Sequence, residues 1–313
     1  MTSIPDSGLF EQIDTFPDET AKRRYDELVG LDDVKARLDK EASLLIDPTQ
    51  LEDWSKKHHG GKVIAATRAF GERIPLFVFA GDVGTGKTAL AETFGDRVAR
   101  ELGVELLLMR LSLRARGAGS VGEMTQLISS AFDYVQKEIP VPKPGKRPTS
   151  AAVLLIDEAD ALAQSRELAQ MHHEDRAGVN ALIRGIDGIA QQRRPVITVM
   201  CSNRLSALDP AIQRRAADIF EFRRPNQEQR EEILRRAFAD AGITPDQIAE
   251  LARTTGPADG RDYGYTYSDL TTRLIPNAVL DALPNRPLAF ARIAELAVET
   301  PPTAPFTQEP GTG

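Results

Sequence analysis

An eight-residue glycine-rich segment, Gly81-Asp-Val-Gly-Thr-Gly-Lys-Thr88, limits what this chain can fold into more than any other feature. It directly follows an apolar run at residues 76–80 and leads into a helical pattern over residues 89–101. In a strand, loop and helix of this order, backbone N–H groups converge on phosphate oxygens at the helix N-terminus. The sequence therefore predicts a phosphate-binding loop between a buried strand and a helix.

The residues of this loop have defined parts in such a motif. Gly84 and Gly86 permit a close approach of the backbone that a Cβ would obstruct. Lys87 supplies a positive charge to the β- and γ-phosphates, and Thr88 supplies a hydroxyl where Mg²⁺ binds. We therefore expect a nucleoside triphosphate and Mg²⁺ as ligands. The residues expected to contact the nucleotide here are Asp82, Val83, Gly84, Thr85, Gly86, Lys87, Thr88 and Ala89.

Two carboxylates end a second buried-strand pattern. Residues 153–156 are apolar and are followed at once by Asp157 and Glu158. Open α/β sheets bind their ligands at the carboxyl ends of the strands. We interpret Asp157 as a partner of Mg²⁺, bound directly or through its outer shell, and Glu158 as the general base that polarises the attacking water. Asp160, close behind them, is interpreted as a solvated charge at the start of a helix.

The apolar runs also predict the fold. Five β-rich runs recur with helical patterns between them, at residues 75–80, 104–111, 152–156, 195–201 and 218–222. This rhythm is typical of βαβ units and a parallel sheet, and after residue 222 only helical spacing continues. We predict an α/β fold, a three-layer P-loop NTPase with a five-stranded parallel sheet, followed by a small all-helical lid domain. The expected boundaries are a flexible leader at 1–21, the large α/β domain at 22–224, the lid at 225–299 and a disordered tail at 300–313.

The charge balance and the single cysteine argue against several classes of protein. Lys and Arg total 39 against 46 Asp and Glu, a formal charge of -7, so bulk electrostatics disfavours nucleic acid as a partner. Cys201 is the only cysteine, which excludes an intramolecular disulfide and fits a reducing compartment. No apolar run approaches the ~18 residues that a membrane helix needs, and the N-terminal stretch lacks a signal-peptide core. We expect a cytoplasmic protein without a membrane partner.

Beyond the loop and the acidic pair, residues 24–298 resemble the ATPases associated with diverse cellular activities, the AAA+ superfamily. The segment at 28–35, which contains Val29 and Gly30, is similar to the entry motif whose backbone lines the adenine pocket. Residues 197–203 look like the sensor 1 strand, which ends in Asn203. The resemblance implies that the chain is an ATPase, that ATP is its nucleotide, and that Asn203 bridges the γ-phosphate and the attacking water.

Residues 208–218 resemble the segment that carries the arginine finger of this superfamily. Such a finger completes the ATP site of a neighbouring subunit and stabilises the charge of the transition state. The resemblance therefore implies a homo-oligomer, most often a hexameric ring. The usual second arginine position holds Ala217, which leaves Arg214 and Arg215 as the candidates.

The order of the motifs and the segment at 267–276 are similar to the pachytene-checkpoint and thyroid-receptor-interactor ATPases, which remodel HORMA-domain proteins. Bacterial members act in cyclic-oligonucleotide anti-phage signalling, where they disassemble a HORMA complex and restrain a nucleotidyltransferase. The resemblance implies a HORMA-type protein substrate, with Arg273 as sensor 2. It also implies a pore loop around Ser120, Val121 and Gly122, in which Ser120 replaces the common aromatic residue.

Two other functions share these ATPase motifs. A nucleic-acid-associated machine, such as a clamp loader or an initiator, would carry all of them, but the acidic balance and the lack of an appended DNA-binding domain argue against it. A nucleotide-gated scaffold with negligible hydrolysis is the third possibility, and Glu158 with the two arginines argues against that one.

Overall fold

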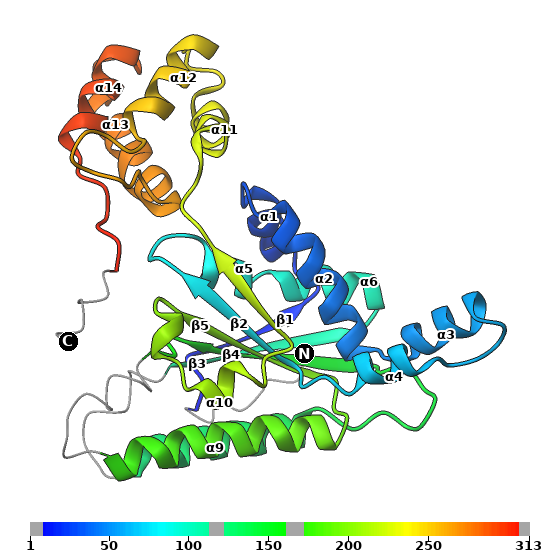
Figure 1. Cartoon of the computed structure of the whole chain (residues 1–313). Helices are drawn as coiled ribbons and strands as arrows, with labels where there is room; N and C mark the ends of the chain where they lie inside the picture. The colour runs from blue at the N-terminus through cyan, green and yellow to red at the C-terminus, as the bar shows by residue number, and fades with distance from the viewer. Residues whose placement is uncertain (1–8, 113–121, 161–171, 307–313) are drawn as a thin grey trace. The chain divides into compact units, whose positions relative to one another are not determined.

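The computed structural model of the chain describes residues 9–112, 122–160 and 172–306 (Figure 1). The described residues cluster into two compact units. The first, which we call the sheet unit, comprises the chain up to Glu27, Asp33–Ala80 and Thr88–Glu221. The second, the lid unit, comprises Leu28–Asp32, Gly81–Lys87 and the chain from Phe222 onwards.

The sheet unit is built on a sheet that has six strands among the described residues, in the order β1-β3-β4-β5-β2-β6. The strands are β1 (Gln12–Phe16), β2 (Leu76–Gly81), β3 (Glu105–Ser112), β4 (Ser150–Asp157), β5 (Val196–Ser202) and β6 (Asp218–Phe222). The β3–β4, β4–β5 and β5–β2 pairs are parallel, so the carboxyl ends of these strands share one edge of the sheet. This mostly parallel α/β sheet confirms the predicted fold class, although β1 adds a sixth strand, antiparallel to β3, to the five parallel strands that were predicted.

Strand β1 corrects the expectation of a flexible leader at residues 1–21. It pairs antiparallel with β3, with Gln12 opposite Arg110 and Phe16 opposite Leu106, and Phe16 is buried. Helix α1 (Glu19–Glu27) follows at once. The pairing satisfies the backbone groups along the outer edge of β3, which a flexible leader would leave open. The expectation was wrong for residues 12–21, because a strand of five residues carries too little periodicity to be recognised, and residues 1–8 lie outside the described part of the chain.

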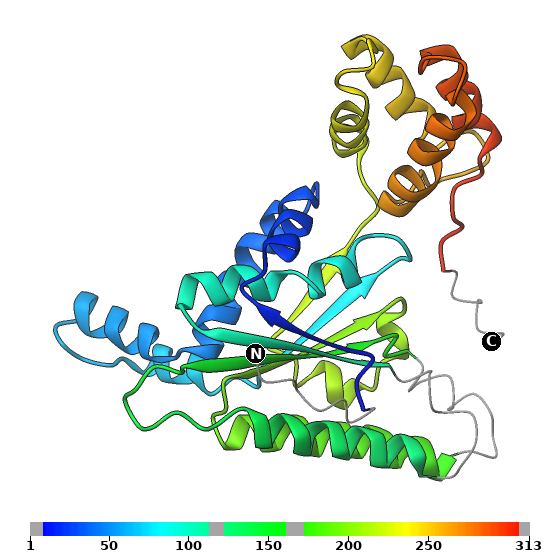
Figure 2. The same ribbon diagram turned by 180° about the vertical axis from the view of Figure 1, so that it is seen from behind.

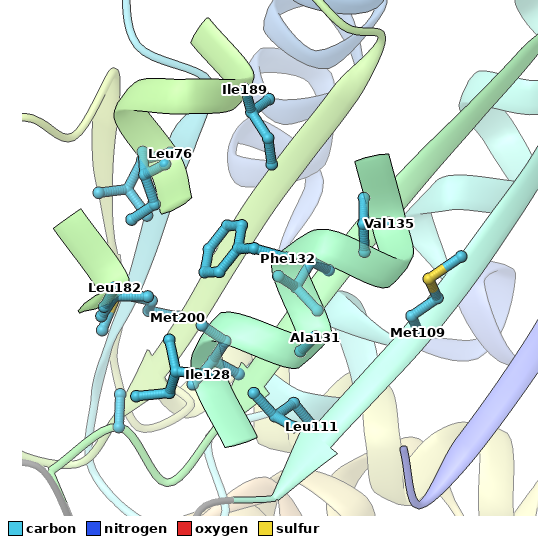
Figure 3. Packing of buried hydrophobic residues seen from close by; sticks show 14 of the residues in the cluster. Leu76, Met109, Leu111, Ile128, Ala131, Phe132, Val135, Leu182, Ile189 and Met200 are labelled. Carbon is cyan, nitrogen blue, oxygen red and sulfur yellow. The ribbon is translucent and has the colours of Figure 1, made fainter. Parts of the chain in front are cut away.

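Helices cover both faces of the sheet (Figures 1 and 2). The helices α7 (Glu123–Glu138) and α9 (His172–Gln191) cover one face, and α1, α2 (Asp32–Ile46) and α6 (Phe94–Leu102) cover the other. Figure 3 shows Phe132 of α7 packed among buried side chains of the sheet and of α9. A Cβ at Gly185 of α9 would lie 2.3 Å from the Phe132 ring, so this glycine lets the two helices pack closely. The shorter helices of this unit are α3 (Thr49–His58), α4 (Ala65–Gly71), α5 (Lys87–Ala91), η1 (Leu205–Ala207) and α10 (Pro210–Gln213).

The lid unit has a small helical core of its own. Its elements are α11 (Gln227–Phe238), α12 (Pro245–Thr254), the π-helical turn η2 (Asp269–Leu274), α13 (Ile275–Ala282) and α14 (Phe290–Glu299). Leu234, Leu251 and Leu270 are fully buried in this core. Capping boxes begin α11, at Asn226 and Gln229, and α12, at Thr244 and Gln247, which explains where both helices start.

The expected disordered tail from residue 300 also needs correction. The Tyr265 hydroxyl donates to the carbonyl oxygens of Ala297, at 2.8 Å, and of Thr300. Thr303 donates to the Asp269 carboxylate from its N–H at 3.0 Å and from its hydroxyl at 2.6 Å. Because Asp269 is buried, its oxygens need such donors, and they order the chain as far as residue 306. Residues 307–313 lie outside the described part of the chain.

None of the described helices is both long enough and apolar enough to cross a membrane.

Candidate functional site

The phosphate loop joins β2 to α5 and rests on residues of the lid unit. Gly84 has a φ of +73°, and a Cβ there would lie 2.7 Å from the hydroxyl of Thr266. Its carbonyl accepts a hydrogen bond from the Ser268 N–H at 3.1 Å. Glycine is therefore required at this position both for the left-handed backbone and for the close contact with the lid segment.

Lys87 is buried at the base of this loop. Its Nζ donates to the carbonyl oxygens of Gly81 at 2.8 Å and of Asp82 at 2.7 Å, and the Thr85 hydroxyl donates to the same Asp82 carbonyl at 2.7 Å. The loop thereby holds a cation next to the N-terminus of α5, an arrangement suited to binding phosphate. Val83 is exposed at the loop tip, and Ala89 lies in α5.

The turn at residues 28–32 is anchored by lid side chains. Gln229 donates from its Nε2 to the carbonyl of Gly30 at 3.1 Å, and the Tyr267 hydroxyl donates to Gln229 Oε1, also at 3.1 Å. Burial raises the pKa of Tyr267 to about 12, so its hydroxyl remains a donor at neutral pH. Val29 packs against the lid core, and a Cβ on Gly86 would lie 3.5 Å from Leu31. The predicted adenine-lining turn therefore lies beside the phosphate loop.

Asp157, at the end of β4, is central to a polar network in the sheet unit. Its Oδ1 accepts a hydrogen bond from the Thr88 hydroxyl at 3.3 Å, and its Oδ2 accepts one from Arg110 at 3.0 Å. Arg110 also donates to Glu92 at 2.6 Å. A hydroxyl oxygen beside a carboxylate oxygen offers the hard ligands that Mg²⁺ prefers, and phosphate and water complete its shell in nucleotide sites. Thr88 and Asp157 therefore fit the ion.

Glu158 follows Asp157 in a strained backbone conformation. Its φ is +53°, which is uncommon for a residue with a Cβ, and its N–H donates to Asp157 Oδ1 at 2.9 Å. Such conformations persist where the surrounding structure holds them and are concentrated at functional positions. This observation is consistent with the predicted role of Glu158 as a general base.

Asn203 comes directly after β5 and is joined to Asp160. The Asn203 N–H lies 3.4 Å from Asp160 Oδ1, and Asp160 is only 3% exposed. The interpretation of Asp160 as a solvated charge is therefore wrong. Its carboxylate connects the segments that follow β4 and β5, a contact between residues far apart in sequence that no local pattern predicts.

The two candidate finger arginines have different surroundings. Arg215 forms an ion pair with Asp187 on α9, with N–O distances of 3.2 and 3.4 Å, and donates to the carbonyl of Ala211 at 3.1 Å. Arg214 is exposed, and its guanidinium forms no ion pair or hydrogen bond with any residue in the described ranges. Of the two, Arg214 is the one that can reach outwards.

Arg273 lies in η2 and is paired within the lid unit. It donates to Asp269 Oδ1 at 2.9 Å. Burial alone would raise the pKa of Asp269, but hydrogen bonds from Thr303 and Thr266 outweigh it and hold the pKa below its usual value. Arg273 is partly exposed beyond this pair, so the predicted contact with phosphate stays a prediction.

Two of the predicted pore-loop residues, Ser120 and Val121, lie outside the described residues. Gly122 is described and precedes α7, with a φ of +89°. The single cysteine, Cys201, is buried in β5.

The predicted residues divide between the two units. The sheet unit holds Thr88, Ala89, Asp157, Glu158, Asn203, Arg214 and Arg215, and the lid unit holds Val29, Gly30, residues 82–87 and Arg273. Sequence reasoning missed three side chains that hold these groups, namely Arg110, Arg224 and Gln229. Gln229 is separated by 199 positions from Gly30, and Arg224 by 142 from its partner Asp82, so local sequence patterns carry no signal for either contact.

Comparisons with known proteins found related sequences and structures. The family model described as ATPase family associated with various cellular activities (AAA) matches residues 77–224. CD-NTase-associated protein 6 of Escherichia coli strain MS 115-1 is 50% identical over 299 residues, which cover 95% of this chain and 96% of that protein. A chain in the structure of the E. coli MS115-1 HORMA:CdnC:Trip13 complex is 49% identical, with a TM-score of 0.87 and coverage of 95% of this chain and 97% of that one. The structure of a Rhizobiales Trip13 is 44% identical, with a TM-score of 0.73 and coverage of 95% and 100%.

Proposed function

The chain belongs to the AAA family of ATPases, and we propose that it uses ATP hydrolysis to remodel a HORMA-type protein and so regulates a bacterial cyclic-oligonucleotide anti-phage signalling complex. The observation that carries this proposal is the likeness, at 49% identity over 95% of the chain, to a component of the E. coli HORMA:CdnC:Trip13 complex. The name of the relative, CD-NTase-associated protein 6, supports a link to a nucleotidyltransferase partner.

The described side chains support a division of the hydrolytic work. Lys87 and the N–H groups of its loop bind the phosphates, and Glu158 takes the proton of the attacking water. Thr88 and Asp157 would hold Mg²⁺, which when bound neutralises charge on the β- and γ-phosphates. Asn203 orients the attacking water, and Arg273 contacts a phosphate. Arg110 holds the second oxygen of Asp157, so that the first remains directed to Thr88.

The active form in this proposal is a homo-oligomeric ring, a hexamer, in which Arg214 completes the site of a neighbouring subunit. Arg214 is exposed, whereas Arg215 is held by Asp187 of its own chain. The substrate grip is assigned to the segment around Ser120, Val121 and Gly122 on the basis of its sequence. A chain with one buried cysteine is suited to the reducing cytoplasm, where we place this activity.

A reconstitution tests the proposal directly. A bacterial HORMA protein in complex with its nucleotidyltransferase is incubated with this ATPase and ATP, and the products are separated by size-exclusion chromatography. We expect the wild-type chain to release the HORMA protein and the HORMA complex to raise the ATPase rate. The variant Glu158→Gln should leave the complex intact, whereas Glu105→Gln, which alters an exposed carboxylate at the start of β3, should behave as the wild type.

Two results would overturn the proposal. One is an intact HORMA complex in the presence of actively hydrolysing wild-type enzyme. The other is an ATPase rate that rises with DNA and not with the HORMA complex, which would favour a nucleic-acid-associated ATPase.

A further inference from the structure

The phosphate loop of this chain contains an acidic residue, Asp82, directly after its first glycine. A carboxylate in this position adds a negative charge to a loop that must bind the negatively charged phosphates. A positive charge close to the carboxylate is needed to offset this repulsion. The structure shows where the compensation comes from. Every oxygen of the Asp82 carboxylate accepts hydrogen bonds from neighbouring groups of the lid unit.

Arg224 provides two of these four hydrogen bonds. Its Nε and Nη2 both donate to Asp82 Oδ2, at 2.8 and 2.5 Å. The other oxygen, Oδ1, accepts from the N–H of Val83 at 3.0 Å and from the N–H of Phe306 at 3.1 Å. The C-terminal segment that is tied to Asp269 through Thr303 therefore also reaches the phosphate loop.

Contacts other than the one with Asp82 also hold the Arg224 side chain in place. Its Nη1 donates to the carbonyl of Gly264 at 2.7 Å, and its guanidinium lies 4.9 Å from the centroid of the Tyr263 ring. The side chain is only 14% exposed. A planar guanidinium that is fixed by a carbonyl and an aromatic face loses little further freedom when it pairs with a carboxylate.

We propose that Arg224 is a positioning residue for nucleotide binding, which neutralises Asp82 and fixes the carboxylate so that the phosphate loop can accept ATP. This inference rests on the binding of ATP phosphates by residues 81–88. Arg224 acts through Asp82, and the proposal assigns it no contact with the nucleotide. The N–H of Phe306 stabilises the same carboxylate by a hydrogen bond, which gives the C-terminal segment a part in the affinity for ATP.

An electrostatic role and a packing role lead to different results when both partners are changed. Removal of Arg224 alone leaves an unpaired carboxylate beside the phosphates, whereas removal of the Asp82 charge makes the arginine unnecessary. If Arg224 served only to pack the lid segment against the loop, the second substitution would bring no recovery.

The test measures binding of a fluorescent ATP analogue together with kcat and KM for ATP. We expect Arg224→Gln to weaken binding and raise KM by about tenfold, with kcat within about twofold of the wild type. The double variant Asp82→Asn/Arg224→Gln should regain affinity to within about threefold of the wild type. Higher ionic strength should shrink the defect of Arg224→Gln, because salt screens the unpaired charge.

Arg261 supplies a matched control. Its guanidinium lies 5.7 Å from the centroid of the same Tyr263 ring but donates to the carbonyl of Gly256. Arg261→Gln therefore removes a positive charge from beside the same aromatic ring without freeing Asp82, and its affinity for ATP should match the wild type. Thermal unfolding of each variant confirms that the lid remains folded.

Three outcomes would overturn the inference. These are a double variant as weak as Arg224→Gln, an Arg261→Gln variant that is equally weak, and an Arg224→Lys variant that keeps the charge but binds ATP no better than Arg224→Gln. If Arg224→Gln unfolds, Arg224→Lys is compared with the wild type instead. The lysine variant must then keep most of the wild-type affinity for ATP. Failure of the wild-type protein to bind ATP would count instead against the assignment of the phosphate loop.

Discussion

The sheet unit and the lid unit carry different kinds of functional groups. The sheet unit holds the groups assigned to bond breaking, namely Asp157, Glu158 and Asn203 at or directly after the ends of β4 and β5, and Arg214 directly after helix α10. The lid unit holds the groups assigned to nucleotide binding, among them Lys87, Gly30 and Asp82, which are fixed by lid side chains such as Gln229 and Arg224. We infer that changes in the sheet unit act mainly on kcat and that changes in the lid unit act mainly on nucleotide affinity.

The largest effect is expected from Arg214 in the assembled protein. Arg214→Ala should lower kcat by about 10³–10⁵-fold with little change in ATP affinity, because the arginine acts on the charge of the transition state. Arg215→Ala breaks the ion pair with Asp187 and should lower stability by about 1 kcal/mol while most of the hydrolysis remains. The two variants are compared in steady-state ATPase assays, at a protein concentration high enough for complete assembly.

Mixed assemblies show whether Arg214 acts on a neighbouring subunit. Neither Arg214→Ala nor Glu158→Gln should hydrolyse ATP alone, but an equal mixture creates sites that combine an intact Glu158 with an intact Arg214 from the neighbour. Such sites make up about a quarter of the total in a random ring. A mixture that stays inactive although the subunits co-assemble would contradict the proposed role of Arg214.

A second prediction compares one residue from each unit at the same nucleotide. Glu158→Gln should lower kcat by about 10²–10⁴-fold and leave ATP binding intact, since only proton transfer is lost. Lys87→Ala should instead abolish measurable binding, because a buried cation of the phosphate loop is removed. Equilibrium binding of a fluorescent ATP analogue separates the two. Weak binding of ATP by Glu158→Gln would contradict the inference that the sheet unit acts mainly on kcat and the lid unit mainly on nucleotide affinity.

The functional features that could be predicted from the sequence are those encoded by short continuous segments. The phosphate loop and the Asp157–Glu158 pair each follow an apolar run, so both the strand and the loop after it are visible in a few residues. The mostly parallel α/β fold followed from the same alternation. Strand β1 was missed because it is short and belongs to the sheet only through its pairing with β3.

The contacts that join distant segments could not be predicted in this way. Gly30 was expected from a motif, but its bond to Gln229 joins two segments that no pattern connects. The same holds for Asp82 with Arg224 and for Asp160 with Asn203. Arg214 and Arg215 are adjacent in sequence and equal in charge, and only the position of Asp187 distinguishes them.

The pKa of a buried or partly buried carboxylate is raised at Asp39 in the sheet unit and lowered at Asp269 in the lid unit. This difference leads to a third prediction. Burial raises the pKa of Asp39, in α2 of the sheet unit, to about 6, although the Tyr25 hydroxyl donates to it at 2.6 Å. Because the folded state holds this proton more tightly than the unfolded state, stability falls as the pH rises from about 4 to 6. Asp39→Asn should therefore stabilise the protein at pH 7.5, by about 1–2 kcal/mol, and should have little effect near pH 4.

Thermal unfolding at the two pH values tests this prediction. Asp33→Asn, which changes an exposed carboxylate on the same helix, is the control and should leave the melting temperature unchanged at both. A stabilisation of equal size at pH 4 and at pH 7.5 would show that the effect comes from packing and not from the ionisation of Asp39.

The smallest effect concerns Asp269, the contrasting carboxylate of the lid unit. Its pKa lies below the usual value because hydrogen bonds from Thr303 and Thr266 outweigh the effect of burial, so its contribution to stability is present at neutral pH and is lost in acid. Thr303→Val removes the 2.6 Å bond from the hydroxyl and should destabilise the lid by about 1 kcal/mol at pH 7. Thr303→Ser keeps the hydroxyl and should restore stability. Hydrogen exchange in η2 and α14 measures the effect where it arises. Equal protection in the valine and serine variants would mean that the remaining donors, the N–H groups of Thr303 and Thr266 and the Arg273 guanidinium, satisfy Asp269 without the Thr303 hydroxyl.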